Sequence, residues 1–321
     1  MKRMLQRMVS PELILLAMLG SGTVFSQDYP GKPVRIVVSG PGNSADFSAR
    51  LVAQGISPAL GQQVIIDNRG SGVLPGEIVS KAAPDGYTLL VAGGTFFNGP
   101  LLQEVPFDPV KDFAPISMIS TTPNIIVVHP SLPVKSVRDL IALAKAKPGA
   151  LNYSSSGNGS SSHLAAELFK SMASVNIVRI PYKSGSTRIS SLIGGEVQVE
   201  FAVSSSVMPY VQSGKLRAVA VTSLQPSALA PGLPTVTATG VPGYEAVAFY
   251  GAFAPAKTPA AIINRLNQEM VRYLVTAVAK EQLLGRGADA ASSTPEQLAS
   301  TMKSEIAKIS KIIKAAGIVA D

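Results

Sequence analysis

Apolar and polar positions alternate along the chain in blocks of two kinds. Short, almost continuous apolar runs such as VRIVVS (34–39) and NIIVVHP (124–130) are typical of buried strands. Segments with a 3.6-residue apolar period, such as FSARLVAQGISPALG (47–61), lie between them and predict helices. The alternation predicts an α/β fold whose sheets are buried and largely parallel.

Two helices are predicted to close the chain. The first runs over 259–280 and the second over 295–317, because apolar residues recur at helical spacing in both. Thr294 and Gln297 have the spacing of a capping box at the start of the second helix.

Two long extended stretches carry no signals for tight turns. They cover 119–128 and 247–254, and each can cross between two α/β lobes. Two crossings make a hinge, and ligands of open α/β sheets lie beyond the carboxyl ends of the strands. The sequence therefore predicts a clamshell, with lobe 1 formed by 27–122 plus 248–321 and lobe 2 formed by 123–247.

The N-terminal segment 1–26 has the pattern of a secretory signal peptide. Three basic residues precede an apolar run from Leu13 to Leu19, and small residues follow as far as Ser26. The basic residues are Lys2, Arg3 and Arg7. The apolar run is shorter than the roughly 20 residues that cross a bilayer. We therefore expect export, with cleavage near Ser26.

The chain has no cysteine, so its fold rests on core burial and it cannot carry a lipid-modified cysteine anchor. Without segment 1–26, 25 basic residues face 19 acidic ones, which gives a formal charge of +6. The basic residues are spread along the chain, and the densest group, KSEIAKISKIIK, is spaced like the solvated face of a helix. This distribution argues against nucleic-acid binding. A mildly positive surface favours anionic small molecules.

The segment YSSSGNGSSSHLAAELFK (153–170) leads a serine-rich loop into a helix and contains one of the two histidines, His163. A serine nucleophile would need Ser160 or Ser161 activated by this imidazole. Neighbouring residues at a helix start point in different directions, and the segment lacks the Gly-x-Ser-x-Gly elbow. An exported serine hydrolase is therefore the alternative hypothesis, not the leading one.

Phosphate, dinucleotide and metal sites are not supported by the motifs. Neither GNGSSSH nor GPGNSAD supplies the P-loop lysine or the third glycine of a dinucleotide fingerprint. The two histidines share no spacing with acidic residues that would suit a metal. We therefore expect no cofactor and no metal.

The start of a helix offers another use for the serine-rich loop. The first amides of a helix have no internal partner, and the helix dipole attracts an anion to them. Two or three charge-assisted hydrogen bonds, at about 1.5–3 kcal/mol each, approach the roughly 8 kcal/mol of a micromolar complex. The same serines can also cap the helix.

From Tyr29 onward the chain resembles the substrate-binding receptors of tripartite tricarboxylate transporters, the Bordetella uptake gene family. The phrases YPGKPVRIVV, ALGQQVIIDNR, KAAPDGYTLL, FDPVKDFAPIS and IPYKSG occur in family order over nearly the whole mature length. The resemblance implies a type II periplasmic-binding-protein clamshell with two strand crossovers at its hinge. It further implies a monomeric periplasmic receptor, not an enzyme, which binds a small carboxylate and delivers it to inner-membrane permease subunits.

The resemblance also implies the binding residues, since two loops hold the carboxylates in this family. The candidates are Ser39, Gly40, Pro41, Gly42, Asn43, Asp46 and Thr95 in lobe 1, and Ser155, Gly157, Asn158, Gly159, Ser160 and Ser161 in lobe 2. Asp46 is expected to fix the first helix start, while amides near Gly42 and Asn43 and from Gly157 to Ser160 face the ligand. The hydroxyls of Ser155, Ser160 and Ser161 are expected to donate to it. Thr95 is expected in a loop, and Lys183 on the surface.

The first lobe departs from the family pattern. The family loop Pro-Phe-x-Pro-Gly-Gly-x-x-Asp is here SGPGNSAD, one residue shorter, with Asn43 in place of the second glycine. GSGVLPG and GGTFFNGP are also contracted, and in the second lobe Ala202 replaces a common aspartate. The serine-rich loop keeps the family pattern. A third hypothesis follows, in which an orphan receptor uses its altered cleft for signalling or protein contact.

Overall fold

The structure, a computed structural model, describes residues 29–70, 73–155, 159–182 and 185–318. The predicted signal peptide therefore lies outside the described residues, as does Lys183.

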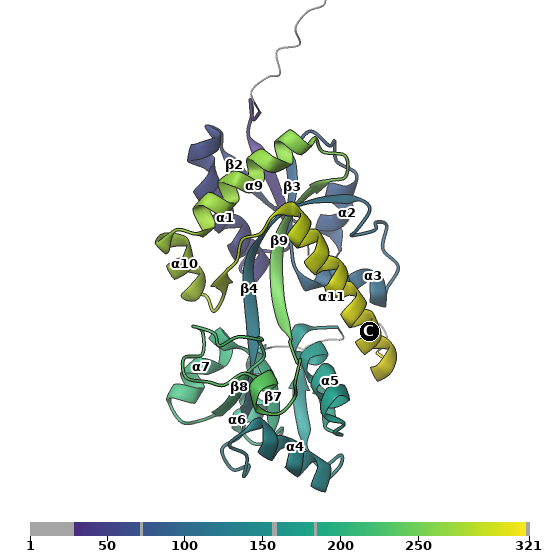
Figure 1. Cartoon of the computed structure of the whole chain (residues 1–321), viewed down its shortest axis with the longest axis vertical. Coiled ribbons are helices and arrows are strands. Elements are labelled where there is room, and N and C mark those ends of the chain that lie inside the picture. The colour runs from purple at the N-terminus through teal and green to yellow at the C-terminus, as the bar shows by residue number, and fades with distance from the viewer. Residues whose placement is uncertain (1–28, 71–72, 156–158, 183–184, 319–321) are drawn as a thin grey trace, which may run out of the picture.

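Two groups of elements occupy opposite ends of an elongated molecule (Figure 1). The first group comprises β1 (Val34–Val38), α1 (Ser44–Leu60), β2 (Val64–Asn68), α2 (Leu74–Ser80), β3 (Thr88–Ala92), α3 (Gly94–Leu102), β9 (Val247–Pro255), α9 (Ala260–Leu274), α10 (Ala277–Leu284), β10 (Asp289–Ala290) and α11 (Pro295–Ala316). The second group comprises α4 (Val137–Ala146), β5 (Asn152–Ser155), α5 (Ser161–Ala173), β6 (Val178–Pro181), α6 (Gly185–Ile193), β7 (Val199–Val203), α7 (Ser204–Gln212), β8 (Arg217–Val221) and α8 (Val236–Thr239). The long strand β4 (Phe113–Val128) belongs to both groups.

The strands form one continuous mixed sheet. Within the described residues its order is β2-β1-β3-β9-β4-β7-β5-β6, with β8 and β10 each paired to β4. The pairs of β1 with β2 and β3, and of β5 with β6 and β7, are parallel. Every antiparallel pair includes β4 or β9. The expectation of a largely parallel sheet is therefore wrong at its centre, because β4 leaves the first group and β9 returns to it in the opposite direction.

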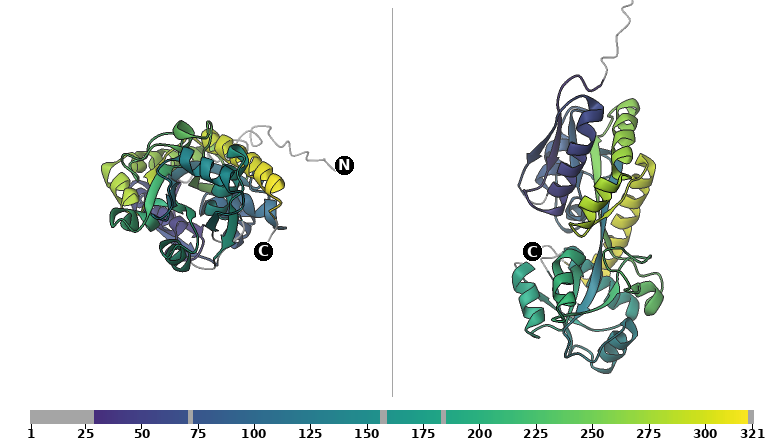
Figure 2. Two further views of the ribbon diagram at one scale, coloured as in Figure 1. Left: turned by 90° about the horizontal axis from the view of Figure 1, so that it is seen from below. Right: turned by 90° about the vertical axis from the view of Figure 1, so that its left-hand side faces the viewer.

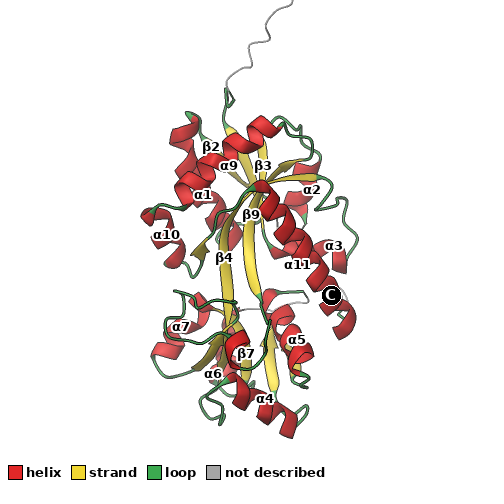
Figure 3. Cartoon of the chain, in the orientation of Figure 1, coloured by secondary structure: helices red, strands yellow, loops and turns green. Residues whose placement is uncertain are grey.

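The two predicted crossings coincide with these central strands. β4 pairs with β9 from Phe113 to Pro123 and with β7 and β8 beyond Asn124, so it spans both groups. β9 begins at Val247, directly after the chain leaves the second group. Helices lie outside the strands at both ends of the molecule (Figure 3). The fold is thus an α/β clamshell with two connections between its halves.

Each group has its own apolar core. In the first group, Ile36, Val52 and Leu266 are fully buried between the sheet and helices α1 and α9. In the second, Tyr153 and Phe169 are fully buried with the strands around β5. Separate cores allow the halves to move relative to each other.

Two predicted helices differ from the observed ones. α1 begins at Ser44, three residues earlier than its apolar period suggested, because Asn43 caps it. The helix predicted over 259–280 is divided into α9 and α10, since Thr276 has extended dihedrals and accepts a hydrogen bond from the amide of Ala279. The capping box of Thr294 and Gln297 is present, as predicted.

α11 connects the two groups along one side. It starts in the first group and runs to the second, where it lies beside α5 (Figure 2). Ile309, Ile312 and Ile313 of α11 form an apolar cluster with Leu164 of α5. The C-terminal helix therefore forms one wall of the space between the halves.

Candidate ligand-binding cleft

Three helices begin at the space between the two groups, each directly after a strand. They are α1 after β1, α3 after β3 and α5 after β5. The amides of Ser44, Gly94 and Ser161, the first residue of each helix, have no hydrogen-bond acceptor within the described residues. Unpartnered amides at a helix start, together with the helix dipole, favour an anion.

Two adjoining cavities lie at these helix starts. The first, here the α1 cavity, has a volume of about 300 Å³ and is lined by Ser39, Asn43, Ser44 and Ala45, among others. The second, the α11 cavity, has a volume of about 290 Å³ and lies between α3, α5, α11 and the start of β9. Gly94, Thr95 and Tyr250 line both cavities. A ligand whose carboxylate binds at the start of α3 can therefore place the rest of its atoms in either cavity.

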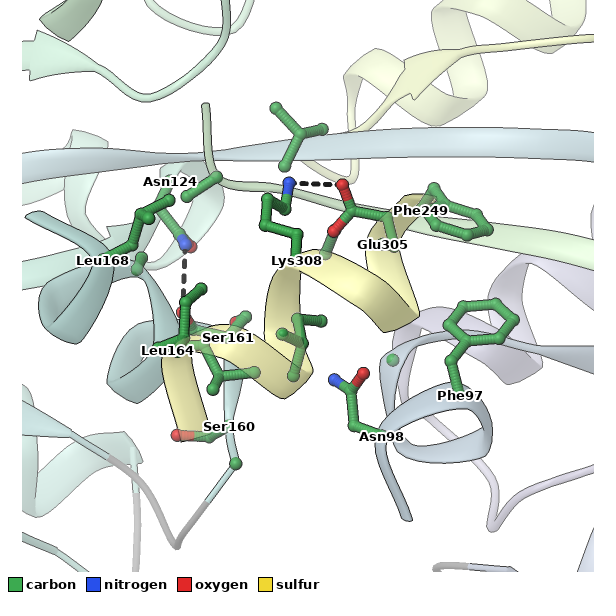
Figure 4. Close-up of a pocket in the computed structure, with 18 of the residues that line it drawn as sticks. Phe97, Asn98, Asn124, Ser160, Ser161, Leu164, Leu168, Phe249, Glu305 and Lys308 are labelled. Atoms are coloured by element: carbon green, nitrogen blue, oxygen red, sulfur yellow. Dashed lines mark hydrogen bonds and ion pairs between the residues drawn. The ribbon is translucent and has the colours of Figure 1, made fainter. Parts of the chain in front are cut away.

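The α11 cavity combines polar and apolar walls (Figure 4). Its polar lining includes Asn98, Asn124, Ser160, Ser161, Glu305 and Lys308, and its apolar lining includes Phe97, Leu164, Leu168, Phe249, Ile309 and Ile312. Volumes near 300 Å³ are at the lower end of the range for small-molecule sites. The cavity is thus suited to a small molecule with an apolar part.

Aromatic packing holds α3 in place. The Phe96 ring lies 4.7 Å from that of Phe113, and the Phe97 ring lies 4.7 Å from that of Phe249, measured between centroids. Thr95 and Asn98 are three positions apart and so share a helix face, which borders the α11 cavity. The expectation that Thr95 lies in a loop is wrong, since the GGTFFNGP segment forms most of this helix.

The first loop is fixed by Asn43 and Asp46. Asn43 Oδ1 accepts from the Asp46 amide at 3.0 Å, and Asn43 Nδ2 donates to the Gly40 carbonyl at 2.6 Å. The buried Asp46 carboxylate accepts from the Gly42 amide at 2.9 Å and from Asn68 Nδ2 at 2.8 Å. Asp46 therefore holds the helix start, as expected. The Gly42 amide, however, is directed to Asp46, so the expectation that it faces the ligand is wrong.

The charge on Asp46 is stabilised by its partners. Burial alone raises the pKa of this carboxyl, but hydrogen bonds from Arg50, the Gly42 amide and Asn68 outweigh burial and lower the pKa below its ordinary value. Arg50 Nε lies 3.0 Å from Asp46 Oδ1 and neutralises the charge. The carboxylate thus supports the loop without leaving an unpaired negative charge beside an anion site.

The serine-rich loop ends in a capped helix. Ser160 is the N-cap of α5, and its hydroxyl accepts from the His163 amide at 3.4 Å and contacts the Ser162 hydroxyl at 3.3 Å. The buried His163 ring accepts from the Gly159 amide at its Nδ1, 3.3 Å away. The expectation that the Gly159 amide faces the ligand is therefore wrong, because the imidazole binds it.

The remaining candidates either line one of the two cavities, border neither of them, or lie outside the described residues. Ser39 and Asn43 line the α1 cavity, and Gly159, Ser160 and Ser161 line the α11 cavity. Gly40, Pro41, Gly42, Asp46 and Ser155 border neither cavity. Gly157 and Asn158 lie outside the described residues. Ser155 is fully buried and accepts from Arg179 Nε at 2.7 Å, which makes it a support of the loop.

Sequence reasoning missed four residues of the cleft. Asn98 and Tyr250 come from elements that looked like a loop and a hinge strand, while Glu305 and Lys308 looked like the solvated face of α11. Burial raises the pKa of Glu305, and the ion pair with Lys308 opposes this without reversing it. The nearby isoleucines of α11, at helical spacing with this pair, are the signal that could have indicated a buried face.

Within the described part of the chain, no group of three or more His, Asp or Glu side chains could hold a metal ion. No helix there is both long and apolar enough to cross a membrane.

Two α/β halves joined by long strands, with helix starts facing the space between them, define a two-lobed solute-binding protein. Residues 48–318 match the tripartite tricarboxylate transporter family receptor. The chain therefore belongs to this receptor family, as the sequence resemblance predicted.

Known proteins are similar over nearly the whole chain. Protein BugT of Bordetella pertussis is 32% identical over 311 residues, which cover 95% of each chain. The structure of R. palustris Rpa4515 with adipate has 34% identity and a TM-score of 0.76, and covers 92% of this chain and 100% of that one. The structure of MatC (Rpa3494) from Rhodopseudomonas palustris with bound malate has 26% identity and a TM-score of 0.70, and covers 89% of this chain and 100% of that one. The two solved structures contain adipate and bound malate, respectively.

Proposed function

We propose that this protein is a periplasmic receptor that captures a small carboxylate in the cleft between its lobes for a tripartite tricarboxylate-type transporter. The observation that carries the proposal is the convergence of the starts of α1, α3 and α5 on two adjoining cavities. Adipate and malate, present in the structures of two relatives, are small carboxylates.

The amides of Ser44, Gly94 and Ser161, which have no acceptor among the described residues, supply the recognition. Each charge-assisted bond to a carboxylate contributes about 1.5–3 kcal/mol, so two or three of them approach micromolar affinity. The Ser161 side chain adds a hydroxyl at the same point. A lysine or arginine contact is not required for this binding mode.

We further propose that binding is not coupled to catalysis. In a serine hydrolase, His163 would have to take a proton from Ser160 or Ser161. Instead, Nδ1 of the buried imidazole accepts from the Gly159 amide, and the Ser160 hydroxyl caps α5. These contacts favour a structural role for both residues.

Export, lobe boundaries and partners complete the proposal. A signal peptide cleaved near Ser26 would place the receptor in the periplasm, where monomers shuttle between solution and inner-membrane permease subunits. Lobe 1 would comprise 27–122 plus 248–321, and lobe 2 would comprise 123–247. These limits fall within β4 and at the start of β9, where the chain passes between the two cores.

A thermal-shift screen tests the proposed function. The mature chain, refolded to remove any carried ligand, is heated with succinate, malate, adipate and citrate, and with the matching amides as uncharged controls. At a hundred times its Kd, a ligand stabilises the fold by about 2.7 kcal/mol. At least one carboxylate should raise Tm while its amide does not, and the His163→Ala variant should retain this response.

Two results favour the alternatives. Steady ester hydrolysis that disappears in His163→Ala would establish the hydrolase and contradict the receptor. If no acid raises Tm, and mass spectrometry of the protein as purified finds no bound acid, the orphan receptor for signalling or protein contact becomes the better hypothesis.

A further inference from the structure

Asn98 has a buried side chain at the wall of the α11 cavity. The residue is 6% exposed, and its Oδ1 atom has no hydrogen-bond partner within the described residues. Figure 4 shows the carboxamide directed toward the interior of the cavity. Buried polar atoms are almost always hydrogen-bonded, so an unpaired carboxamide at a cavity indicates a ligand group that pairs with it.

Away from the starts of α3 and α5, the α11 cavity does not favour a second charged group. Leu164, Phe249 and Ile312 supply apolar walls. Among the described residues that line the cavity, the one cation is Lys308, which forms an ion pair with Glu305 on the same helix. A ligand anion in this part of the cavity would lose water against apolar side chains and would meet the Glu305 carboxylate.

The groups that would recognise a carboxylate and a neutral polar group lie on one helix, α3. Gly94 and Thr95, at the start of α3, line both cavities and present the amides suited to a carboxylate. Asn98 lies four residues after Gly94, about 6 Å farther along the helix axis. One small molecule can therefore contact the helix start with its carboxylate and Asn98 with another group.

We propose that the part of the α11 cavity between Asn98 and α11, away from the starts of α3 and α5, receives the uncharged end of the ligand, an aliphatic body with one neutral hydrogen-bonding group that pairs with Asn98. This inference rests on the proposed carboxylate function and narrows its substrate class. The preferred ligands are monocarboxylates that carry a distant hydroxyl or amide, in preference to dicarboxylates and tricarboxylates.

A matched six-carbon series tests the substrate class by calorimetry. It consists of adipate, its half-amide adipamate, 6-hydroxyhexanoate, hexanoate and the neutral hexanamide. Adipamate or 6-hydroxyhexanoate should bind at least about tenfold more tightly than both adipate and hexanoate. If adipate binds as tightly as either, the inference is wrong while the carboxylate function stands. If hexanamide binds as tightly as the acids, the proposed function itself fails.

The Asn98→Leu variant tests whether Asn98 pairs with the neutral group of the ligand. Leucine has a similar size and removes the unpaired carboxamide, so the Tm of the ligand-free protein should stay the same or rise. The preference for adipamate over hexanoate should fall to about one. A structural asparagine would behave differently, and Asn267→Leu provides the comparison, because Asn267 Nδ2 donates to the carbonyls of Ile116 at 2.7 Å and Ser293 at 2.8 Å. If Asn98→Leu lowers Tm as much as Asn267→Leu, the proposed role is wrong.

The Glu305→Gln variant tests the exclusion of a second charge. It removes the anion and leaves Lys308 without its ion-pair partner. The affinity for adipate should rise about tenfold, while that for adipamate should change little. An unchanged affinity for adipate would contradict the role assigned to Glu305.

Discussion

The hydroxyl of Ser154 donates a hydrogen bond to the carboxylate of Glu200, 3.0 Å away, and both side chains are fully buried. Glu200 also forms an ion pair with Arg188 of α6. Burial raises the pKa of Glu200, although Arg188 and Ser154 oppose the shift. Since Ser154 lies near the end of β5, this buried network supports the strand from which the serine-rich loop begins.

Glu200→Ala should destabilise the fold strongly. The change removes the Glu200 carboxylate from the guanidinium of Arg188, which is 9% exposed. Breaking a buried ion pair on one side costs about 3–5 kcal/mol. Urea denaturation should show a loss of this size, and Glu281→Ala, at an exposed position, should change the free energy of unfolding little. A loss below about 1 kcal/mol for Glu200→Ala would show that the pair adds little to the fold.

The contribution of Asp46 to stability should depend on pH. Its pKa is lower in the folded protein than the ordinary value of about 3.9. Its contribution is therefore fully present above that ordinary value and is lost as the pH falls through the folded pKa. Asp46→Asn should lower the free energy of unfolding by about 1.5–3 kcal/mol near neutral pH, and the difference from wild type should shrink on acidification. A difference that is constant with pH would contradict the assigned role of the Asp46 charge. Glu104→Gln, at an exposed position, is the control for the loss of a carboxylate charge.

The contact between Gly159 and Leu102 brings the two groups together. Gly159 has a φ of +70°, and a Cβ atom there would lie 2.4 Å from Leu102 Cδ1 of α3. Gly159→Ala should therefore reduce stability through backbone strain of about 1–2 kcal/mol and through the displacement of Leu102. Gly214→Ala separates the two effects, because Gly214 has a φ of +73° and no atom near its Cβ position.

A double-mutant cycle measures the cost of displacing Leu102. Adding Leu102→Ala to Gly159→Ala should recover the steric part, with a coupling energy of about 1 kcal/mol in thermal unfolding. Additive losses would indicate that Leu102 adjusts without cost.

The sequence predicted the elements whose signals are local. β1 and the last part of β4 follow from continuous apolar runs, α1 follows from its apolar period, and the start of α11 follows from the Thr294 capping box. α3 was missed because two glycines and two phenylalanines give it weak local signals. Its position depends on rings that come from distant strands, such as Phe113.

The candidate site was predicted only where a single segment of the chain carries its residues. Ser160 and Ser161 lie in a motif that a single segment displays, and they line the α11 cavity. Glu305 and Lys308 come from the C-terminal helix, and only the fold brings them opposite α5. The directions of the Gly42 and Gly159 amides also depend on side chains several residues away, so spacing alone could not give them.

Substitutions of Ser160 should separate its capping role from ligand binding. Ser160→Ala should destabilise the fold by about 1 kcal/mol, since the helix loses its N-cap acceptor. Ser160→Asp should retain stability, because aspartate caps helices as well as serine does, yet its charge would repel a carboxylate at the start of α5.

Calorimetry with the acid that raises Tm most should therefore show at least a tenfold loss of affinity for Ser160→Asp. Thr276→Asp is the matched control, since Thr276 is the N-cap of α10 and lines neither cavity. It should leave both the affinity and Tm nearly unchanged. Equal affinities for Ser160→Asp and wild type would mean that the ligand carboxylate does not bind at the start of α5.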